Sequence, residues 1–480
     1  MSSEKIKSRI DAHVIPTYAR FPIALTHGEG CHVFDADGKR YLDLGAGIAT
    51  ACLGHGHPEV AAALAEQASK LTHVSNLYYT GPQGLLAEKL VALAGGSGKV
   101  FFCNSGAEAN EALYKLARLR GADDGQFETL TTLGSFHGRT LAGIAATGQP
   151  KVKEGFAPAV EGFRHVPYGD LKAMREAISP ATGAILVEPI QGESGVNCAS
   201  PDYLLGLREL CDERNLLLLL DEVQCGHFRT GNFFGWQTIM TAHAEFAPDA
   251  CSMGKSIAAG LPMGAIWASA PLQDLLGPGS HGTTFGGTPL VSTSALKAIE
   301  IIERDDLAKN TTEIGNYLAE QIGQLIAHHP NVLREVRGLG LMIGVELAEG
   351  IDVFAESKRP ASVQIVERLH TAGLLTIPAG ARVFRLLPPL NISKQDADEG
   401  LAACDCGPMV VRESRERPGY VFGALLVVHG SRHGRGVDGH WFAEFSDFLV
   451  EHTNFLANLQ VLMVHIEFAC LWIDCTLDEP

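Results

Sequence analysis

The sequence predicts an α/β fold, in which a mainly parallel sheet is flanked by helices and joined to a smaller α+β domain. Three stretches are almost continuously apolar and close on polar residues: 99–104, 183–190 and 216–223. Amphipathic stretches of helical length follow the first two of them, over 107–120 and 200–215. Strands that are apolar on both faces and separated by helices are typical of a parallel sheet.

The other elements follow from local signals. The helix over 200–215 begins with Ser200, which suits an N-cap, and with Pro201, which suits the first helical position. Residues 28–47 indicate a small antiparallel hairpin with turns at "ADG" and "GAG". Residues from about 291 to 400 mix helices with short strands, which indicates the second, smaller domain.

These signals divide the chain into four parts. We expect an N-terminal segment that contributes to the small domain, a large domain that holds the functional site, a small domain, and an atypical tail. Their predicted bounds are 1–54, 55–290, 291–403 and 404–480.

Composition excludes several classes of protein. The 480 residues carry 38 basic and 55 acidic side chains, a net charge of −17, which disfavours binding to nucleic acid or to an anionic membrane. No apolar run approaches the roughly 18 residues of a membrane span, and the N-terminus lacks the apolar core of a signal peptide. The eleven cysteines show no zinc spacing. We expect a cytoplasmic protein with reduced thiols and no metal.

Polar residues close the buried strands, and in a parallel sheet such residues meet at one edge. The first strand ends in a turn of small residues, where Ser105 and Glu108 match a capping box. The N–H groups of this turn suit an anion, although an ordinary capped helix has the same pattern. Asp221 closes another strand, where a buried carboxylate requires a partner. That partner is a cationic group, a helix terminus, a metal ion shared with Glu222, or the protonated ring nitrogen of a cofactor.

Lys255 stands among small and apolar residues in "CSMGKSIAAGLPMG" (251–264). Such surroundings lower the pKa of an amine and make it nucleophilic toward an aldehyde, although a surface lysine in a glycine-rich loop would look similar. An anion-binding turn, a strand-end carboxylate and an isolated lysine are together the parts that hold pyridoxal 5′-phosphate. This combination favours the cofactor interpretation of Asp221.

Several motifs occur in the order found in one known family: "NSGAEANE", "FHGRT", "EPIQGE", "LDEVQ", "GKSIAAGLPMGA", "HGTTFGGTPL" and "RGLGLMIGVEL". With "RFPIALTHGEG", "YLDLGAGIA" and "LGHGHPEV" they cover about residues 15–400. The chain thus resembles the class III (subgroup II) aminotransferases of fold type I. This resemblance implies a pyridoxal-phosphate enzyme that acts as a homodimer with shared active sites.

The resemblance also implies roles for individual residues around the cofactor. Lys255 would bind the cofactor covalently and carry the proton during transamination, and Asp221 would pair with its ring nitrogen. The remaining cofactor-binding residues implied are Ser105, Gly106, Ala107, Phe136, His137, Val223, Gln224 and, across the dimer interface, Thr284.

The resemblance further implies that arginines recognise the substrates. Arg385 matches the residue that binds the α-carboxylate of glutamate, and Glu193 matches the glutamate that pairs with it. Arg139 matches the residue that takes the second carboxylate. The motifs are most like those of acetylornithine aminotransferases, which pass the terminal amino group of N²-acetyl-L-ornithine to 2-oxoglutarate in arginine biosynthesis. Ornithine, succinylornithine and 4-aminobutyrate transaminases are alternatives, and a catalytically inactive binding protein of this fold is another.

Two stretches depart from the family pattern. Cys225, His227 and Phe228 stand where the family usually carries Thr, Val and Gly, so we expect a crowded loop or altered substrate access. His227 is interpreted as a loop residue rather than as an acid–base catalyst. The tail matches nothing in the family and is interpreted as a fused or frameshifted end or as an added helix, and it receives no function.

Overall fold

The computed structural model describes residues 1–355 and 357–413. One compact unit covers Met1–Pro408. Helix α14 (Lys394–Glu413) continues past residue 403 into the predicted tail, and the rest of that tail lies outside the described residues.

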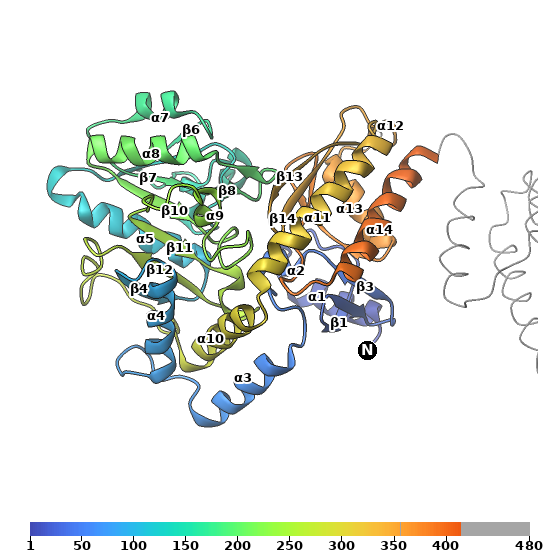
Figure 1. Ribbon diagram of the computed structural model, residues 1–480, viewed down its shortest axis with the longest axis horizontal. Coiled ribbons are helices and arrows are strands. Elements are labelled where there is room, and N and C mark those ends of the chain that lie inside the picture. The colour runs from blue at the N-terminus through green and yellow to red at the C-terminus, as the bar shows by residue number, and fades with distance from the viewer. Residues whose placement is uncertain (356, 414–480) are drawn as a thin grey trace, which may run out of the picture. The chain divides into compact units, whose positions relative to one another are not determined.

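A seven-stranded sheet forms the large part of this unit (Figure 1). Strand β12 is antiparallel to both of its neighbours, and the other adjacent pairs are parallel. The predicted mainly parallel sheet is therefore confirmed. In spatial order the strands are β4 (Lys99–Cys103), β12 (Gly264–Ala268), β11 (Ala250–Met253), β10 (Leu217–Asp221), β7 (Thr182–Val187), β5 (Glu128–Thr132) and β6 (Phe163–Val166).

Helices flank this sheet. Helix α5 (Gly106–Arg120) buries Leu113 and Leu116 against Leu186 and Leu219 of the central strands. The other helices of this part are α3 (Pro58–Lys70), α4 (Gly81–Leu93), α6 (Leu141–Ala146), α7 (Leu171–Ala177), α8 (Pro201–Arg214), α9 (Gly235–Ile239) and α10 (Pro289–Arg304). Its short 3₁₀ turns are η1 (Ala122–Asp124), η2 (Pro150–Lys153) and η3 (Lys255–Ala258), and β8 (Ile190–Gln191) and β9 (Asn197–Cys198) form a two-stranded hairpin.

The predicted helix starts are confirmed. Ser105 caps α5, accepting a hydrogen bond from the N–H of Glu108 at 3.2 Å. Ser200 caps α8 in the same way, accepting from the N–H of Tyr203 at 3.1 Å, with Pro201 at the first helical position. Each cap satisfies one N–H group that the first helical turn would leave without a partner.

Two four-stranded sheets make up the small part. The first runs β13 (Leu333–Leu339), β14 (Met342–Leu347), β17 (Val383–Leu386) and β16 (Ile377–Ala379). The second runs β1 (Leu25–Glu29), β2 (His32–Asp35), β3 (Arg40–Asp43) and β15 (Leu374–Leu375), so it joins the N-terminal segment to the C-terminal one.

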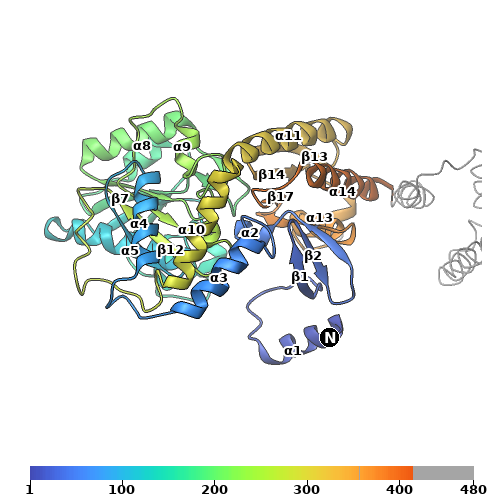
Figure 2. The same ribbon diagram turned by 60° about the horizontal axis from the view of Figure 1, so that its bottom comes forward.

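The helices of the small part are α1 (Ser3–His13), α2 (Ala46–Ala49), α11 (Leu307–His328), α12 (Asp352–Ala355), α13 (Ala361–Thr371) and α14. Helix α10 packs against α3 and α4 and contacts α11, which in turn packs on β13 (Figure 2). This pair of helices therefore connects the large part to the small part. No helix in the described ranges is long and apolar enough to cross a membrane.

The predicted turn at "GAG" is a left-handed helical turn, labelled α2. Ala46, Ile48 and Ala49 adopt φ values of 44°, 63° and 61°. Left-handed backbone costs about 1–2 kcal/mol per residue without glycine, and a β-branched residue there is a true outlier. Asp43 holds the turn, because its Oδ1 accepts from the N–H groups of Gly45 and Ala46, both at 2.9 Å. The turn packs against η3, which begins with Lys255.

Candidate active site

Lys255 lies at the carboxyl edge of the seven-stranded sheet, directly after β11 and Gly254. Its backbone is left-handed, with φ 48°, and the next three residues of η3 are buried. Burial lowers the pKa of the amine, and Arg385 lowers it further, while Glu193 and other carboxylates partly oppose this. In the described part of the chain no hydrogen bond or ion pair holds the Nζ atom. The amine is therefore available as a nucleophile.

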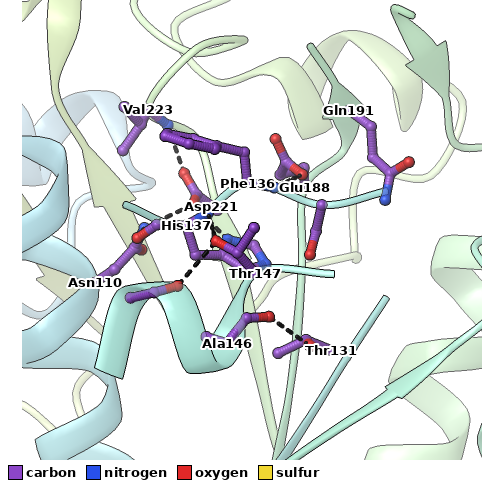
Figure 3. Close-up of polar contacts among 12 residues, drawn as sticks. Asn110, Thr131, Phe136, His137, Ala146, Thr147, Glu188, Gln191, Asp221 and Val223 are labelled. Carbon is purple, nitrogen blue, oxygen red and sulfur yellow. Dashed lines mark hydrogen bonds and ion pairs between the residues drawn. The ribbon is translucent and has the colours of Figure 1, made fainter. Parts of the chain in front are cut away.

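Asp221 ends β10 and is 3% exposed. Its Oδ2 accepts from Asn110 Nδ2 at 2.7 Å and from His137 Nδ1 at 2.8 Å, and its Oδ1 accepts from the N–H of Val223 at 3.1 Å (Figure 3). Burial alone would raise the pKa of this carboxyl, but the His137 contact and the other donors hold it below its ordinary value. Asp221 is thus a buried carboxylate that stays ionised.

The turn before α5 lies against Val223 and against Gly254, which precedes Lys255. A Cβ atom on Gly106 would lie 2.6 Å from Val223 Cγ1, and one on Gly254 would lie 3.1 Å from the Gly106 backbone. These glycines let the turn, Val223 and the segment that carries Lys255 approach one another closely. Within the described residues, the N–H groups of Gly106 and Ala107 have no acceptor. Two N–H groups at the start of a 15-residue helix suit an anion.

Phe136, His137 and Arg139 come from the loop between β5 and α6. The N–H of Phe136 donates to Glu188 Oε2 at 3.1 Å, and Arg139 lies over the Phe136 ring, 5.5 Å from Cζ to the centroid. Arg139 is exposed, whereas His137 is buried. Because a carboxylate only accepts, the His137 Nδ1 atom carries the hydrogen of its bond to Asp221.

Arg385 of β17 reaches from the small part to Glu193. Its Nη1 donates to Glu193 Oε1 at 2.7 Å and its Nη2 to Oε2 at 3.2 Å, while Nη1 also donates to Gln224 Oε1 at 2.8 Å. Gln224 Nε2 donates to Glu193 Oε1 at 3.1 Å. Burial opposes ionisation of Glu193, but the charges of Arg385 and Lys255 outweigh it and lower its pKa to about 2. The structure thus brings together three predicted residues that are distant in sequence.

Thr284 is exposed on the loop between β12 and α10. Its neighbour Thr283 accepts a hydrogen bond from Asn104 Nδ2 at 2.8 Å, which ties this loop to the turn before α5. The contact of Thr284 with a phosphate requires a second chain and stays a prediction.

Glu222 does not join Asp221 in a shared site. Its carboxylate accepts from the N–H groups of Gly235 and Trp236 at 2.7 and 2.9 Å and from Cys225 Sγ at 3.2 Å. Burial raises its pKa to about 7, against the effect of these donors. Glu222 therefore supports the following loop, and the metal interpretation of the Asp221–Glu222 pair has no geometric basis.

The departing loop residues form a buried aromatic cluster. His227 and Phe228 have φ values of 59° and 63°, and both pack on Phe233, with ring centroids 5.7 and 5.4 Å apart. Burial lowers the pKa of His227 to about 3, so the ring stays neutral. The crowded loop expected from the sequence is observed, and His227 is a structural part of it.

Two residues of the site were not assigned a role from the sequence. Asn110 contacts Asp221, and Glu188 contacts the Phe136 backbone. Glu188 stands out only as a polar residue that closes a buried strand. Burial and the Asp221 charge raise its pKa well above the ordinary value. The signal for Asn110 is a single amide on the apolar face of α5, where Ala109, Ala112 and Leu113 surround it in sequence.

Comparison with known proteins identifies the family. The sequence profile of the family described as "Aminotransferase class-III" matches residues 14–405. The acetylornithine aminotransferase of Gloeobacter violaceus is 44% identical over 400 residues, 83% of this chain and 96% of that protein. The chain belongs to the class-III aminotransferases. The acetylornithine aminotransferase of Myxococcus xanthus is likewise 44% identical, over 83% of this chain and 96% of its own.

Solved aminotransferase structures share the fold. The ornithine aminotransferase of Toxoplasma gondii superposes with a TM-score of 0.79 at 30% identity, covering 86% of this chain and 96% of its own. The acetylornithine aminotransferase of Elizabethkingia anophelis gives a TM-score of 0.73 at 30% identity, covering 85% and 99%. The Toxoplasma gondii enzyme holds pyridoxal phosphate at partial occupancy in its own active site.

The chain is a pyridoxal-phosphate-dependent aminotransferase, and the residues of its site fit this cofactor. Lys255 offers an amine of lowered pKa for the aldehyde. Asp221 offers a buried carboxylate for a protonated ring nitrogen. The N–H groups of Gly106 and Ala107, which lack an acceptor within the described chain, offer donors for the phosphate. These chemistries match the three polar parts of the cofactor.

Proposed function

We propose that this enzyme transfers the terminal amino group of N²-acetyl-L-ornithine to 2-oxoglutarate, which yields the semialdehyde and L-glutamate in arginine biosynthesis. The observation that carries the proposal is the grouping of the Arg385–Glu193 pair and Asp221 around Lys255, whose amine feels the charges of all three. The names of relatives 44% identical to the chain support acetylornithine as the amino donor.

In this proposal the protein residues position the cofactor and move protons. Ser105, Gly106 and Ala107 hold the phosphate, Phe136 and Val223 cover the two ring faces, and Asp221 keeps the ring nitrogen protonated. The ring, when bound, accepts the electron pair left on a deprotonated substrate carbon. Lys255 carries the proton from that carbon, because its amine is buried and burial lowers its pKa. His137 keeps Asp221 in place through its Nδ1 hydrogen bond. Gln224 binds the oxygen beside the aldehyde.

Arg385 gives the enzyme two modes of recognition. Paired with Glu193, its charge is neutralised, which suits an amino donor whose terminal amine approaches the cofactor. Released from Glu193, its two Nη groups match the α-carboxylate of 2-oxoglutarate. Arg139 then takes the second carboxylate, from the exposed position it holds over Phe136. Both reactions would thus proceed in one site by ping-pong exchange.

A homodimer with shared active sites is part of the proposal. Exposed hydrophobic residues follow Asn76 and Thr284 in the chain, namely Leu77, Tyr78 and Tyr79 in the first segment and Phe285 in the second. Asn76 fixes the loop that carries Thr284, since its Nδ2 donates to the carbonyls of Thr283 and Gly286 at 3.2 and 3.0 Å. Exposed apolar side chains near a site are consistent with a contact with another chain. Thr284 would complete the phosphate site of the partner.

The cytoplasm is the proposed location. Free thiols are carried by Cys31, Cys52, Cys103, Cys198, Cys211, Cys225 and Cys251. Reduced cysteines in this number favour a reducing compartment.

A panel of amino donors tests the proposed substrate. Purified enzyme would be assayed with 2-oxoglutarate and, separately, acetylornithine, ornithine, succinylornithine and 4-aminobutyrate, with glutamate as the common product. We expect the highest kcat/KM for acetylornithine. A higher kcat/KM for another donor would make that donor the substrate in place of acetylornithine. Protein that never binds pyridoxal phosphate would contradict the proposed transaminase activity itself.

A further inference from the structure

Asn110 ties three elements of the site together. It lies on α5 and is 2% exposed. Its Nδ2 donates to Asp221 Oδ2 at 2.7 Å, at the end of β10, and to the carbonyl of His137 at 3.0 Å, in the loop after β5 (Figure 3). Both hydrogens of the amide are therefore used, and both point at acceptors.

The orientation of this amide follows from its two neighbours. Reversing it would place Oδ1 against a carboxylate oxygen and a carbonyl oxygen, which both repel it. In the present orientation Oδ1 is buried and has no partner among the described residues. A buried acceptor without a partner costs about 1–3 kcal/mol, so the two donated bonds determine the orientation. Asn110 serves as a donor at this position.

The two oxygens of Asp221 are consequently unequal. Oδ2 accepts from both Asn110 and His137, which fills the two lone pairs of that oxygen. Oδ1 accepts only from the N–H of Val223 among the described residues, at 3.1 Å. The carboxylate cannot rotate without breaking the two shorter bonds. One oxygen is thereby held as an anchor, and the other keeps a lone pair for a ligand.

We infer that Asn110 is a positioning residue for transamination, which fixes the Asp221 carboxylate so that Oδ1 faces the ring nitrogen of the cofactor. This inference rests on the proposed role of Asp221. Asn110 acts as a neutral donor, so it stabilises the ionised carboxylate without adding a charge that would compete with the ring nitrogen. It touches Asp221 and the His137 carbonyl, and its effect on the reaction passes through them.

The position of Asn110 on α5 strengthens the inference. The same helix begins at Gly106, whose N–H is proposed to bind the phosphate, and Asn110 follows one turn later. Helix α5 therefore sets the distance between the phosphate end of the site and the carboxylate end. A substitution at Asn110 loosens the second end while the first remains intact.

Two substitutions and one matched control test this role. Asn110→Ala removes the donor, and Asn110→Asp keeps the shape but places a second carboxylate against Asp221. The control is Asn310→Ala, since Asn310 Nδ2 also donates to two acceptors, the carbonyls of Leu390 and Ile392 at 2.7 and 3.1 Å, in the small part. Each variant is loaded with pyridoxal phosphate, and its folded fraction is measured by circular dichroism.

We expect Asn110→Ala to lower kcat by about 10- to 100-fold, with KM for acetylornithine and 2-oxoglutarate changed less than about twofold. Asn110→Asp should lower kcat further, because two adjacent carboxylates compete for one proton. Both variants should release the cofactor faster on dialysis than the wild type and Asn310→Ala. Unchanged kcat and cofactor release per folded Asn110→Ala or Asn110→Asp protein would overturn the inference.

Asp221→Ala separates this inference from the function on which it rests. If Asp221→Ala loses turnover and cofactor retention while both Asn110 variants keep them, the positioning role of Asn110 is wrong and the proposed function stands. If Asp221→Ala keeps both properties, the role of Asp221 is wrong and that of Asn110 falls with it.

Discussion

Arg385 and Glu193 form a two-bond ion pair across the active site, with N–O distances of 2.7 and 3.2 Å. The arginine is 1% exposed and the glutamate side chain 26% exposed. A buried guanidinium needs its partner, so a substrate carboxylate that takes Arg385 must supply the same two acceptors. We therefore predict that the pair is an exchangeable contact for carboxylate substrates.

Arg385→Ala should affect the two half-reactions unequally. Loss of a charged two-bond contact should slow the 2-oxoglutarate half-reaction by about 10- to 150-fold, and the donor half-reaction by much less. Single-turnover absorbance of the bound cofactor measures each half separately. Arg304→Ala is the control, since Arg304 makes a similar pair with Glu59, at 2.7 and 2.9 Å, on the surface. Equal losses in both halves would contradict the assigned role.

Lys255→Ala should abolish transamination while pyridoxal phosphate still binds noncovalently. Borohydride reduction followed by mass spectrometry should attach the cofactor to the Lys255 peptide of the wild type and leave the variant unmodified. Lys153→Ala serves as the control, because burial lowers the pKa of that lysine too. Turnover retained in Lys255→Ala would mean that another amine carries out the reaction.

Gly106→Ala should weaken both the fold and cofactor binding. The added Cβ would lie 2.6 Å from Val223 Cγ1, and overpacking of this kind costs about 1–3 kcal/mol. In α11, Gly323 has open space around its Cβ position, so Gly323→Ala should stabilise the protein by up to about 1 kcal/mol. Urea unfolding and cofactor titration measure the two effects. Equal stability changes in the two variants would show that the close approach at Gly106 is unimportant.

The Glu193 carboxyl should contribute to acid sensitivity. Its pKa is lowered from 4.5 to about 2 in the folded chain, since Arg385 and Lys255 outweigh the effect of burial. A lowered folded-state pKa adds stability above the unfolded value, and that stability is lost as pH falls from about 5 toward 2. The stability difference between wild type and Glu193→Gln, from urea unfolding at several pH values, should shrink over this range. A difference independent of pH would contradict the prediction.

Local signals in the sequence predicted much of the fold. Ser105 and Ser200 mark the starts of α5 and α8 because an N-cap acts within three residues of the chain. The strand that ends at Asp221 was predicted for a similar reason, since its apolar run is continuous. The roles of Lys255 and Asp221 came from combining such signals with the family resemblance.

Contacts between distant residues could not be predicted in this way. Asn110 and Asp221 are 111 residues apart in sequence, and only the packing of α5 on the sheet brings them together. Glu222 looked equivalent to its neighbour Asp221, but consecutive residues at a strand end point to opposite sides. The left-handed turn at Ala46–Ala49 depends on Asp43 and on contacts with η3, which override the local preference of Ile48.

The pairing of β3 with β15 has a consequence for synthesis of the chain. Lys39, just before β3, donates from Nζ to the carbonyl of Thr371 at 3.0 Å, and these residues are 332 positions apart. At a translation rate of about 5–20 residues per second, the N-terminal hairpin waits about 15 to 65 seconds on the ribosome for its final strand. The seven-stranded sheet ends at Ala268 and can assemble first. The sheet edge at β3 is thus open throughout that interval, and we expect it to be exposed to wrong pairing.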